Sequence, residues 1–180
     1  GDLYIDWKDT STTSSSYTRT LQLDNAIGIT SWTRNGIKYT EEVLVSAPQN
    51  AIVIRLRSSK VGALNFSLSL DRKEHALVSY SLRAIEMTGE MDGGNGDKGM
   101  AFAASVIPVL NGGNIRANNA NLSIENATEC MLVISAATDF SWPDITMRGP
   151  DPLPVVRKAT ASAAGKSWNE LLSSHVKDYQ

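Results

Sequence analysis

The chain has 180 residues, of which 42% are hydrophobic and 20% are charged, and its formal net charge is −2. This length and composition are typical of one folded domain with a substantial core, and they argue against a disordered chain. Because phosphate contacts need clustered lysine and arginine, the balanced charge argues against a nucleic-acid partner. The longest apolar run, residues 101–110, is too short to span a bilayer, so no membrane partner is expected.

The residue types present give little support to metal or cofactor chemistry. Cys130 is the single cysteine, which excludes an internal disulfide, and with two histidines no structural zinc site is expected. Residues 92–99 contain the spacing Gly94-x-Gly96-x-x-Gly99, but a dinucleotide site needs a helix after this loop and a strand-like run follows it. We therefore expect no cofactor and interpret the segment as a loop between strands. A cation on its acidic residues stays open as an alternative.

The N-terminal part of the chain alternates apolar and polar residues with a period of two, which predicts half-buried strands. Asn35-Gly36 lies between two such runs and predicts a tight type I′ hairpin, because both residues tolerate a positive φ. Glu41 falls on the apolar face of its run, so it must lie near a strand end or have a partner. The runs are residues 3–7, 20–29, 37–46, 52–57 and 64–70.

Further strands are expected in the C-terminal part, at residues 77–82, 84–89, 100–110, 121–125 and 131–136. The segment Asn111-Gly112-Gly113-Asn114 predicts another hairpin. Roughly ten short strands, separated by turns at spacings of about 8–12 residues, predict a mainly β chain. The fold class that fits is a large antiparallel β-sandwich of the super-sandwich type.

The last part of the chain predicts two short helices after a loop at residues 141–154, in which four prolines act as breakers. The alanine-rich residues 155–164 are compatible with a helix that ends at Gly165. Ser167 and Glu170 form a capping box, which predicts the start of the second helix. We divide the chain into a sandwich at residues 1–140 and a helical linker with its loop at residues 141–180.

One apolar stripe runs along the second predicted helix and continues to the last residue. We expect this stripe to pack against the sandwich or a neighbouring domain. Because the pattern is unbroken at Gln180, we expect a fragment whose next domain is missing. The residues to which we assign domain packing are Trp168, Leu172, His175, Val176 and Tyr179.

Trp142 is an aromatic residue in a long loop, and Asp144 follows it closely. This is the arrangement of a sugar-stacking site, and both residues are candidates for substrate binding. A hydrophobic plug between the loop and a neighbouring domain has the same pattern. No catalytic residue can be assigned, because glycoside hydrolysis needs a facing pair of carboxylates and the sequence does not pair any two.

Six stretches resemble motifs of one known family in the same order. They begin with Gly-Asp-Leu-Tyr-Ile-Asp and end with His-Val-Lys-Asp-Tyr-Gln, and they are residues 1–6, 17–26, 39–48, 99–102, 136–140 and 175–180. Together they resemble the N-terminal β-sandwich domain of glycoside hydrolase family 95, the α-L-fucosidases, and the linker helices that follow it. Glu41 stands where that family usually has arginine.

The resemblance implies a parent enzyme that removes terminal α-L-fucose or α-L-galactose from oligosaccharides with inversion. Its catalytic residues belong to an (α/α)6 barrel that begins after the position of Gln180. It implies a non-catalytic chain with a structural role, whose partner is its own barrel. It also implies a bacterial source, a periplasmic or secreted location, and further strands ahead of Gly1. Two alternatives stay open: a carbohydrate-binding module that uses Trp142, and a chain that is itself a hydrolase.

Overall fold

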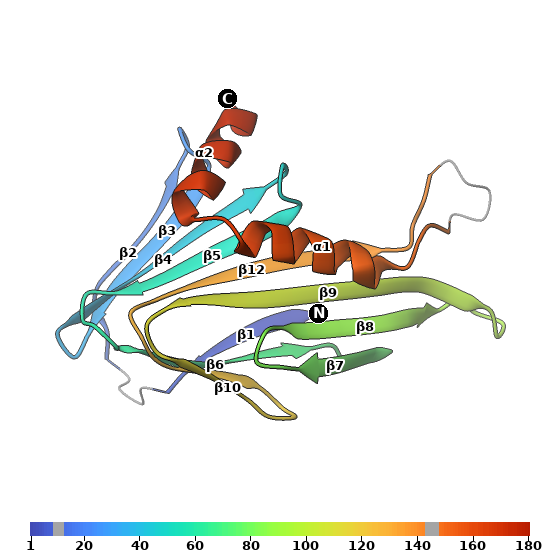
Figure 1. Ribbon diagram of the computed structural model, residues 1–180, viewed down its shortest axis with the longest axis horizontal. Coiled ribbons are helices and arrows are strands. Elements are labelled where there is room, and N and C mark those ends of the chain that lie inside the picture. Colours follow the sequence, from blue (N-terminus) through green and yellow to red (C-terminus); the bar gives the residue numbers. More distant parts are fainter. Residues whose placement is uncertain (9–12, 143–147) are drawn as a thin grey trace.

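The computed structural model describes residues 1–8, 13–142 and 148–180. Within these residues it has twelve strands in two antiparallel sheets, followed by two short helices (Figure 1). The prediction of a mainly β, antiparallel sandwich with a C-terminal helical linker is therefore confirmed. No helix among the described residues is long and apolar enough to cross a membrane.

The larger sheet has eight strands in the order β2-β3-β4-β5-β12-β9-β8-β7. In chain order these are β2 (Ser15–Gln22), β3 (Ile27–Arg34), β4 (Ile37–Ser46), β5 (Ala51–Ser58), β7 (Ala76–Tyr80), β8 (Ile85–Asp92), β9 (Lys98–Asn111) and β12 (Glu129–Thr138). The smaller sheet has the order β1-β6-β11-β10, with β1 (Asp2–Trp7), β6 (Leu64–Asp71), β10 (Asn114–Ala117) and β11 (Leu122–Ala127).

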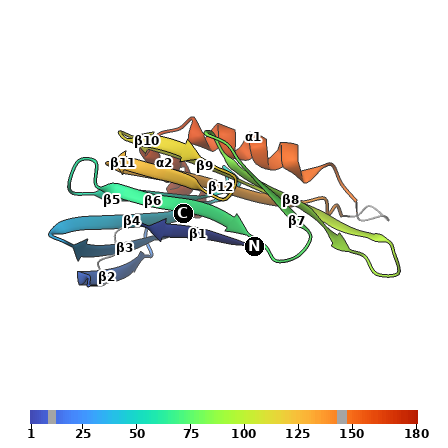
Figure 2. The same ribbon diagram turned by 90° about the horizontal axis from the view of Figure 1, so that it is seen from below.

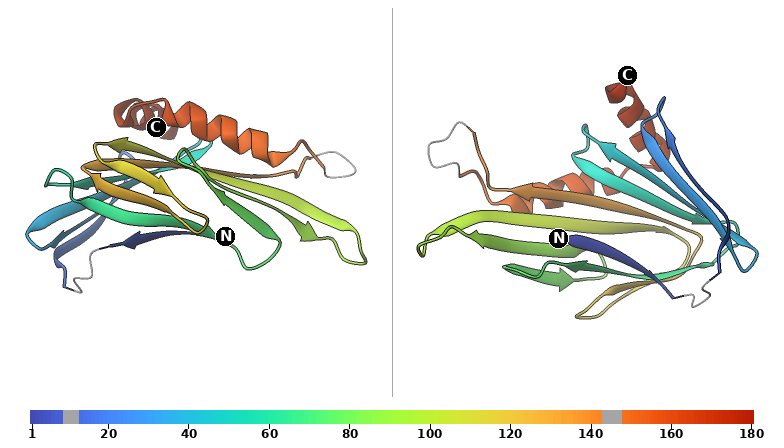
Figure 3. Two further views of the ribbon diagram at one scale, coloured as in Figure 1. Left: turned by 60° about the horizontal axis from the view of Figure 1, so that its bottom comes forward. Right: turned by 180° about the vertical axis from the view of Figure 1, so that it is seen from behind.

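The molecule has three layers. The smaller sheet lies against one face of the larger sheet, and α1 (Pro152–Ala164) and α2 (Trp168–Tyr179) lie against the other face (Figures 2 and 3). A large apolar core fills the space between the sheets, and a second core lies between the larger sheet and the helices. We call the sheet face under the helices the outer face and the face toward the smaller sheet the inner face.

Strand β6 shows why alternation predicts this fold. Its apolar residues are buried between the sheets, whereas Asn65 and the serines between them are only half-buried. Burying one face of each strand is the main apolar contribution to stability. The buried residues of β6 are Leu64, Phe66, Leu68 and Leu70.

The hairpin predicted at Asn35-Gly36 is confirmed, because β3 and β4 pair on either side of this turn. Asn35 and Gly36 have φ values of 51° and 73°, so both central residues of the β3–β4 turn are left-handed, as a type I′ turn requires. The hairpin predicted at residues 111–114 was wrong. Gly112 and Gly113 have positive φ, but this turn carries the chain from β9 in the larger sheet to β10 in the smaller sheet, and β10 pairs with β11. Residues 93–97 form the turn between β8 and β9, so a strand follows the glycine-rich segment and its interpretation as a loop is confirmed.

Several predicted boundaries were wrong. Helix α1 begins at Pro152 and not at residue 155, because proline at the first helical positions removes no helical hydrogen bond. Asp151 caps this helix, and its Oδ1 accepts from the Leu153 amide at 2.9 Å. The four-residue strand β10 was missed because it is too short to show alternation. Pro108 lies inside β9, beyond Val106, the last β9 residue that pairs with β8.

The smaller sheet leaves part of the inner face uncovered. Strand β1 lies at one edge of its sheet and pairs only with β6 among the described strands. A groove of about 730 Å³ runs beside it, and its walls are mainly aliphatic. Farther along the inner face Leu21 and Val45 are each 64% exposed. An aliphatic groove together with exposed apolar side chains on the same face indicates an interaction surface.

Candidate functional site

Helix α2 is held on the outer face of the larger sheet by buried apolar residues. Trp168 is 7% exposed and Leu171 is fully buried. The guanidinium carbon of Arg55, from β5, lies 5.3 Å from the centroid of the Trp168 ring, which is cation–π distance. The predicted capping box is present, since the Ser167 hydroxyl accepts from the Glu170 amide and the Glu170 carboxylate accepts from the Ser167 amide.

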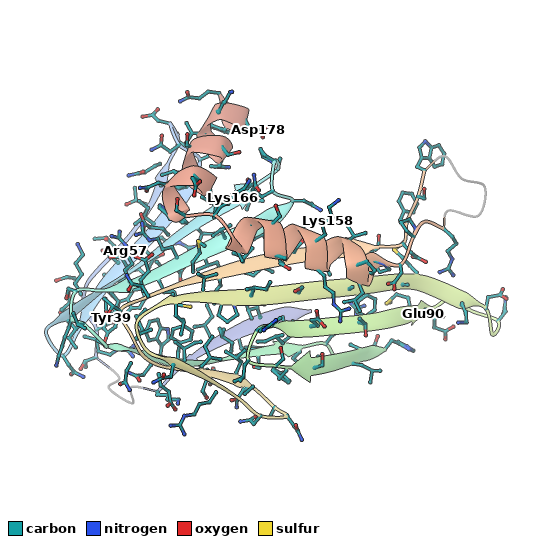
Figure 4. The ribbon with its side chains drawn as sticks, viewed as in Figure 1. Tyr39, Arg57, Glu90, Lys158, Lys166 and Asp178 are labelled. Carbon is teal, nitrogen blue, oxygen red and sulfur yellow. The ribbon has the colours of Figure 1, made fainter. Side chains whose placement is uncertain are left out.

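A charge network surrounds the contact of Trp168 with the sheet. Arg55 forms an ion pair with Glu129 at 2.8 Å and lies 3.6 Å from a Glu42 oxygen. Arg57, which Figure 4 labels on the same strand, forms an ion pair with Glu42 at 3.0 Å. These groups come from three adjacent strands and are only partly exposed. Arg55 and Arg57 alternate with apolar residues along β5, but the sequence alone does not pair them with carboxylates of other strands.

The C-terminal end of α2 is bonded to the turn between β2 and β3. The Nε2 atom of His175 lies 3.2 Å from the carbonyl oxygen of Ala26, and because a carbonyl only accepts, Nε2 carries the proton. The Gln180 side-chain amide donates to the Asp24 carbonyl at 3.3 Å. Tyr179 stacks on the His175 ring, with centroids 6.4 Å apart, and is 52% exposed.

A cleft of about 640 Å³ opens between this end of α2 and strands β2 to β4. It combines aliphatic walls with four polar side chains, namely Arg19, Glu41, His175 and Tyr179. We call it the α2 cleft. Burial raises the pKa of Glu41 above its ordinary value, and the charge of Arg19 opposes this effect. In the sheet register, Thr30 of β3 lies between Arg19 of β2 and Glu41 of β4. The charged partner expected for Glu41 is therefore on β2, two strands away in the sheet.

The α2 cleft does not hold the groups that glycoside hydrolysis needs. An inverting glycosidase places two carboxyl groups about 6.5–9.5 Å apart across a site. Glu41 is the one carboxylate among the described residues that line the cleft. The described residues also hold no group of three or more His, Cys, Asp or Glu that could bind a metal. The arrangement can bind or pack, but it lacks an acid–base pair.

The structure separates the two sets of residues that the sequence singled out. The loop that carries Trp142 lies at the opposite end of the helical layer from α2 (Figure 1). Trp142 is 74% exposed, and Asp144 lies outside the described residues. In the α2 stripe, Trp168 and His175 are buried, Leu172 and Val176 are half-buried, and Tyr179 is exposed.

An ion pair that the sequence did not predict joins the two sides of the loop that contains Trp142. Arg148 Nη1 lies 2.7 Å from Asp139 Oδ2, and the Ala101 amide donates to Asp139 Oδ1 at 2.9 Å. The hydrogen bond from Arg148 is the main reason that the pKa of Asp139 lies below its ordinary value. Residues nine positions apart across a loop leave no periodic signal, so only the fold reveals this pair.

Helix α1 is held on the sheet by polar contacts along its length and at its junction with α2. In its first half, Arg157 donates two hydrogen bonds of 2.7 Å to the carboxylate of Glu86. In its middle, the buried hydroxyls of Thr160 and Ser105 lie 3.2 Å apart. At the junction with α2, Lys166 donates to the Gln49 side chain at 2.7 Å (Figure 4). The two helices therefore hold a defined position on the larger sheet.

Comparison with known proteins places the chain among glycoside hydrolases. The chain is 26% identical to Alpha-L-fucosidase 2 of Arabidopsis thaliana over 206 aligned residues, which cover 100% of the chain and 24% of that protein. It is 29% and 30% identical to Probable alpha-fucosidase A of Aspergillus oryzae and of Aspergillus niger, over 92% and 91% of the chain. It covers 24% and 22% of those two proteins, so it spans about a quarter of the length of these relatives.

Two solved structures share the fold at low sequence identity. A putative kojibiose phosphorylase from the human microbiome matches 98% of the chain with a TM-score of 0.63 and 13% identity, over 27% of its own length. A bacterial glucoamylase complexed with acarbose matches 98% of the chain with a TM-score of 0.54 and 7% identity, over 31% of its length. The family model for the N-terminal domain of glycosyl hydrolase family 65 matches residues 1–142. The expectation of a glycoside hydrolase N-terminal β-sandwich is thus confirmed, and the chain belongs to the family of glycosyl hydrolase family 65 N-terminal domains.

Proposed function

We propose that this chain is the non-catalytic N-terminal part of a fucosidase-like glycoside hydrolase of family 95. Its role is to pack against a catalytic barrel elsewhere in the same protein. The observation that carries this proposal is the α2 cleft, which has a single carboxylate where hydrolysis needs two. The three similar fucosidases support it, because the chain aligns with about a quarter of each.

The proposal extends to the parent enzyme. Its substrate would be an oligosaccharide with terminal α-L-fucose or α-L-galactose, released with inversion, as the resemblance to family 95 implies. The same resemblance leads us to propose a bacterial source and a periplasmic or secreted location. The relatives named above come from a plant and two fungi.

The surface around the α2 cleft is the best candidate for contact with the barrel. Tyr179 is 52% exposed at the end of α2, and Leu21 and Val45, which line the same cleft, are each 64% exposed. Large apolar side chains gathered in this way mark an interaction surface. This surface includes Tyr179, the last residue of α2.

Hydrolysis assays test the proposal. The 180-residue chain and a longer polypeptide of the same protein would each be incubated with fucosylated and L-galactosylated oligosaccharides. We expect monosaccharide release by the longer polypeptide and none by the chain alone. Release by the chain alone that disappears in Glu41→Gln, but persists in the matched variant Glu74→Gln, would show that the chain itself is the hydrolase.

The 74% exposure of Trp142 favours a second candidate function, a carbohydrate-binding module. An exposed indole offers an apolar face on which a sugar ring can stack. Affinity electrophoresis with fucosylated oligosaccharides tests this idea. Retardation of the chain that is lost in Trp142→Ala would support a binding module, and equal mobility of both proteins would rule it out at this loop.

A further inference from the structure

A second hollow lies beside the β3–β4 hairpin, at the opposite end of these strands from the α2 cleft. It has a volume of about 380 Å³, which is near the lower end of the range of about 300–1,000 Å³ for small-molecule sites. Its walls come from the end of β1, from β3 and β4 beside their hairpin, and from the turn between β5 and β6. We call it the hairpin pocket. Tyr39, labelled in Figure 4, lies at its base.

Aromatic rings form the preformed wall of the hairpin pocket. Trp32 and Tyr39 are cross-strand partners whose rings stack with centroids 5.6 Å apart. Trp7 reaches from the smaller sheet and meets both rings at 5.5 and 5.4 Å, in edge-on geometry. Mutual packing fixes the three rings, so a ligand would find them already in place.

Several polar side chains that line the hairpin pocket offer hydrogen-bond donors. Lys60 is exposed and makes no ion pair with any described residue. The indole N–H groups of Trp7 and Trp32 have no acceptor among the described residues. Asn65 uses its Oδ1 to accept from the Asn126 amide at 3.0 Å, which leaves its N–H groups as donors.

The charge of the hairpin pocket has one sign. Its lining includes the cations Lys8, Arg34 and Lys60 and no Asp or Glu among the described residues, and Arg34 is already engaged in another interaction, so Lys60 is the cation on which binding depends. Lys8 is partly neutralised, because it lies 3.0 Å from a Glu125 oxygen outside the lining. A pocket that presents donors and positive charge selects an acceptor-rich anion.

We propose that the hairpin pocket binds an acidic saccharide that carries a carboxylate or a sulfate. The anionic group accepts from Lys60 and from the two indole N–H groups, and the C–H surface of the sugar ring contacts the aromatic wall. The inference does not rest on the proposed function, because the hairpin pocket is separate from the α2 cleft and shares no lining residue with it.

Tryptophan fluorescence titration tests the proposal, in a Trp142→Phe background that removes the exposed indole of the loop. The probes are digalacturonic acid, its neutral methyl ester, galactose 6-sulfate and inorganic sulfate. We expect saturable binding of digalacturonic acid or galactose 6-sulfate. Binding of the ester should be weaker by about tenfold or more, because a hydrogen bond to a charged group contributes about 1.5–3 kcal/mol.

Three variants distinguish binding in the hairpin pocket from non-specific binding to the positively charged surface. Lys60→Gln and Trp32→Phe should each weaken binding of the acidic sugar, because each removes a donor and keeps most of the side chain. Lys73→Gln, an exposed lysine in the turn after β6, should leave the affinity unchanged. Thermal melting checks that the variants fold. The proposal is overturned if no acidic sugar binds, if Lys60→Gln binds as well as the original chain, or if inorganic sulfate binds as tightly as the sugars.

Discussion

At the scale of single residues, Trp168 joins the helices to the sandwich through two kinds of contact. Its ring is almost fully buried in the outer core, and the Arg55 guanidinium lies over it within a network of ion pairs. Removing the ring would leave a cavity and would also expose partly buried charges. One side chain therefore links α2 to β5.

Trp168→Ala is expected to lower the free energy of unfolding by roughly 3–5 kcal/mol, the usual range for deletion of a large buried aromatic ring. Urea denaturation of the purified chain measures this change. Trp142→Ala is the matched control, because Trp142 is 74% exposed and its loss should change stability by less than about 0.5 kcal/mol. Equal midpoints for the two variants would contradict the packing role of Trp168.

Glu41 gives a prediction for the dependence of stability on pH. Burial raises its pKa above the ordinary value of 4.5. A carboxyl group with a raised pKa favours folding most at pH values below its unfolded pKa, and this contribution is lost as pH rises through the folded pKa. We therefore expect Glu41→Gln to gain stability relative to the original chain between about pH 4 and pH 7.

Melting temperatures across this pH range would measure the effect. Glu74→Gln, on an exposed turn, is the control and should show a nearly constant difference from the original chain. A Glu41→Gln curve parallel to that of the original chain would mean that Glu41 is not desolvated in the cleft.

At the scale of elements, the alternation of apolar and polar residues predicted most strands, whereas the start of the first helix was predicted three residues too late. Alternation predicts a strand wherever one face is buried and the other is not, as β6 shows. The start of α1 was predicted too late because Pro152 was interpreted as a helix breaker. Proline interrupts the interior of a helix, but it is favoured at the first helical position. The α2 cleft could not be predicted, because His175 and Ala26, which meet there, are 149 positions apart.

The capping box of α2 gives a prediction at this scale. Ser167→Ala removes the hydroxyl that accepts from the Glu170 amide and should cost about 0.5–2 kcal/mol of stability. Chemical denaturation followed by circular dichroism measures it. Ser173→Ala, an exposed change within the same helix, should be neutral or slightly stabilising because alanine has the higher helix propensity. A loss of stability from Ser173→Ala as large as that from Ser167→Ala would contradict the capping role.

At the scale of the whole molecule, the three layers are unequal in extent. The eight strands of the larger sheet face four strands on one side and two helices on the other, so aliphatic residues such as Leu21 and Val45 stay exposed on the inner face. An exposed apolar residue adds little to the stability of the chain alone, because folding removes little of its surface from water. Its contribution depends on what covers it.

This reasoning predicts different results for one pair of substitutions in two proteins. Leu21→Ser combined with Val45→Ser should change the stability of the 180-residue chain by about 0.5 kcal/mol or less. In a longer polypeptide that includes the proposed barrel, the same pair should lower the melting temperature and increase proteolysis between the domains. An equal effect in both proteins would contradict a domain contact at this surface.

The order of strands in the smaller sheet also determines when the chain can fold during synthesis. Strands β2 to β5 are neighbours in sequence and can pair as soon as they are made. Strand β1 pairs only with β6, near residue 64, and β6 pairs next with β11, near residue 122. At about 5–20 residues per second, β1 waits for seconds without a partner. Strand β1 thus leaves the ribosome well before its partner β6, and its apolar residues need protection from other chains in that interval.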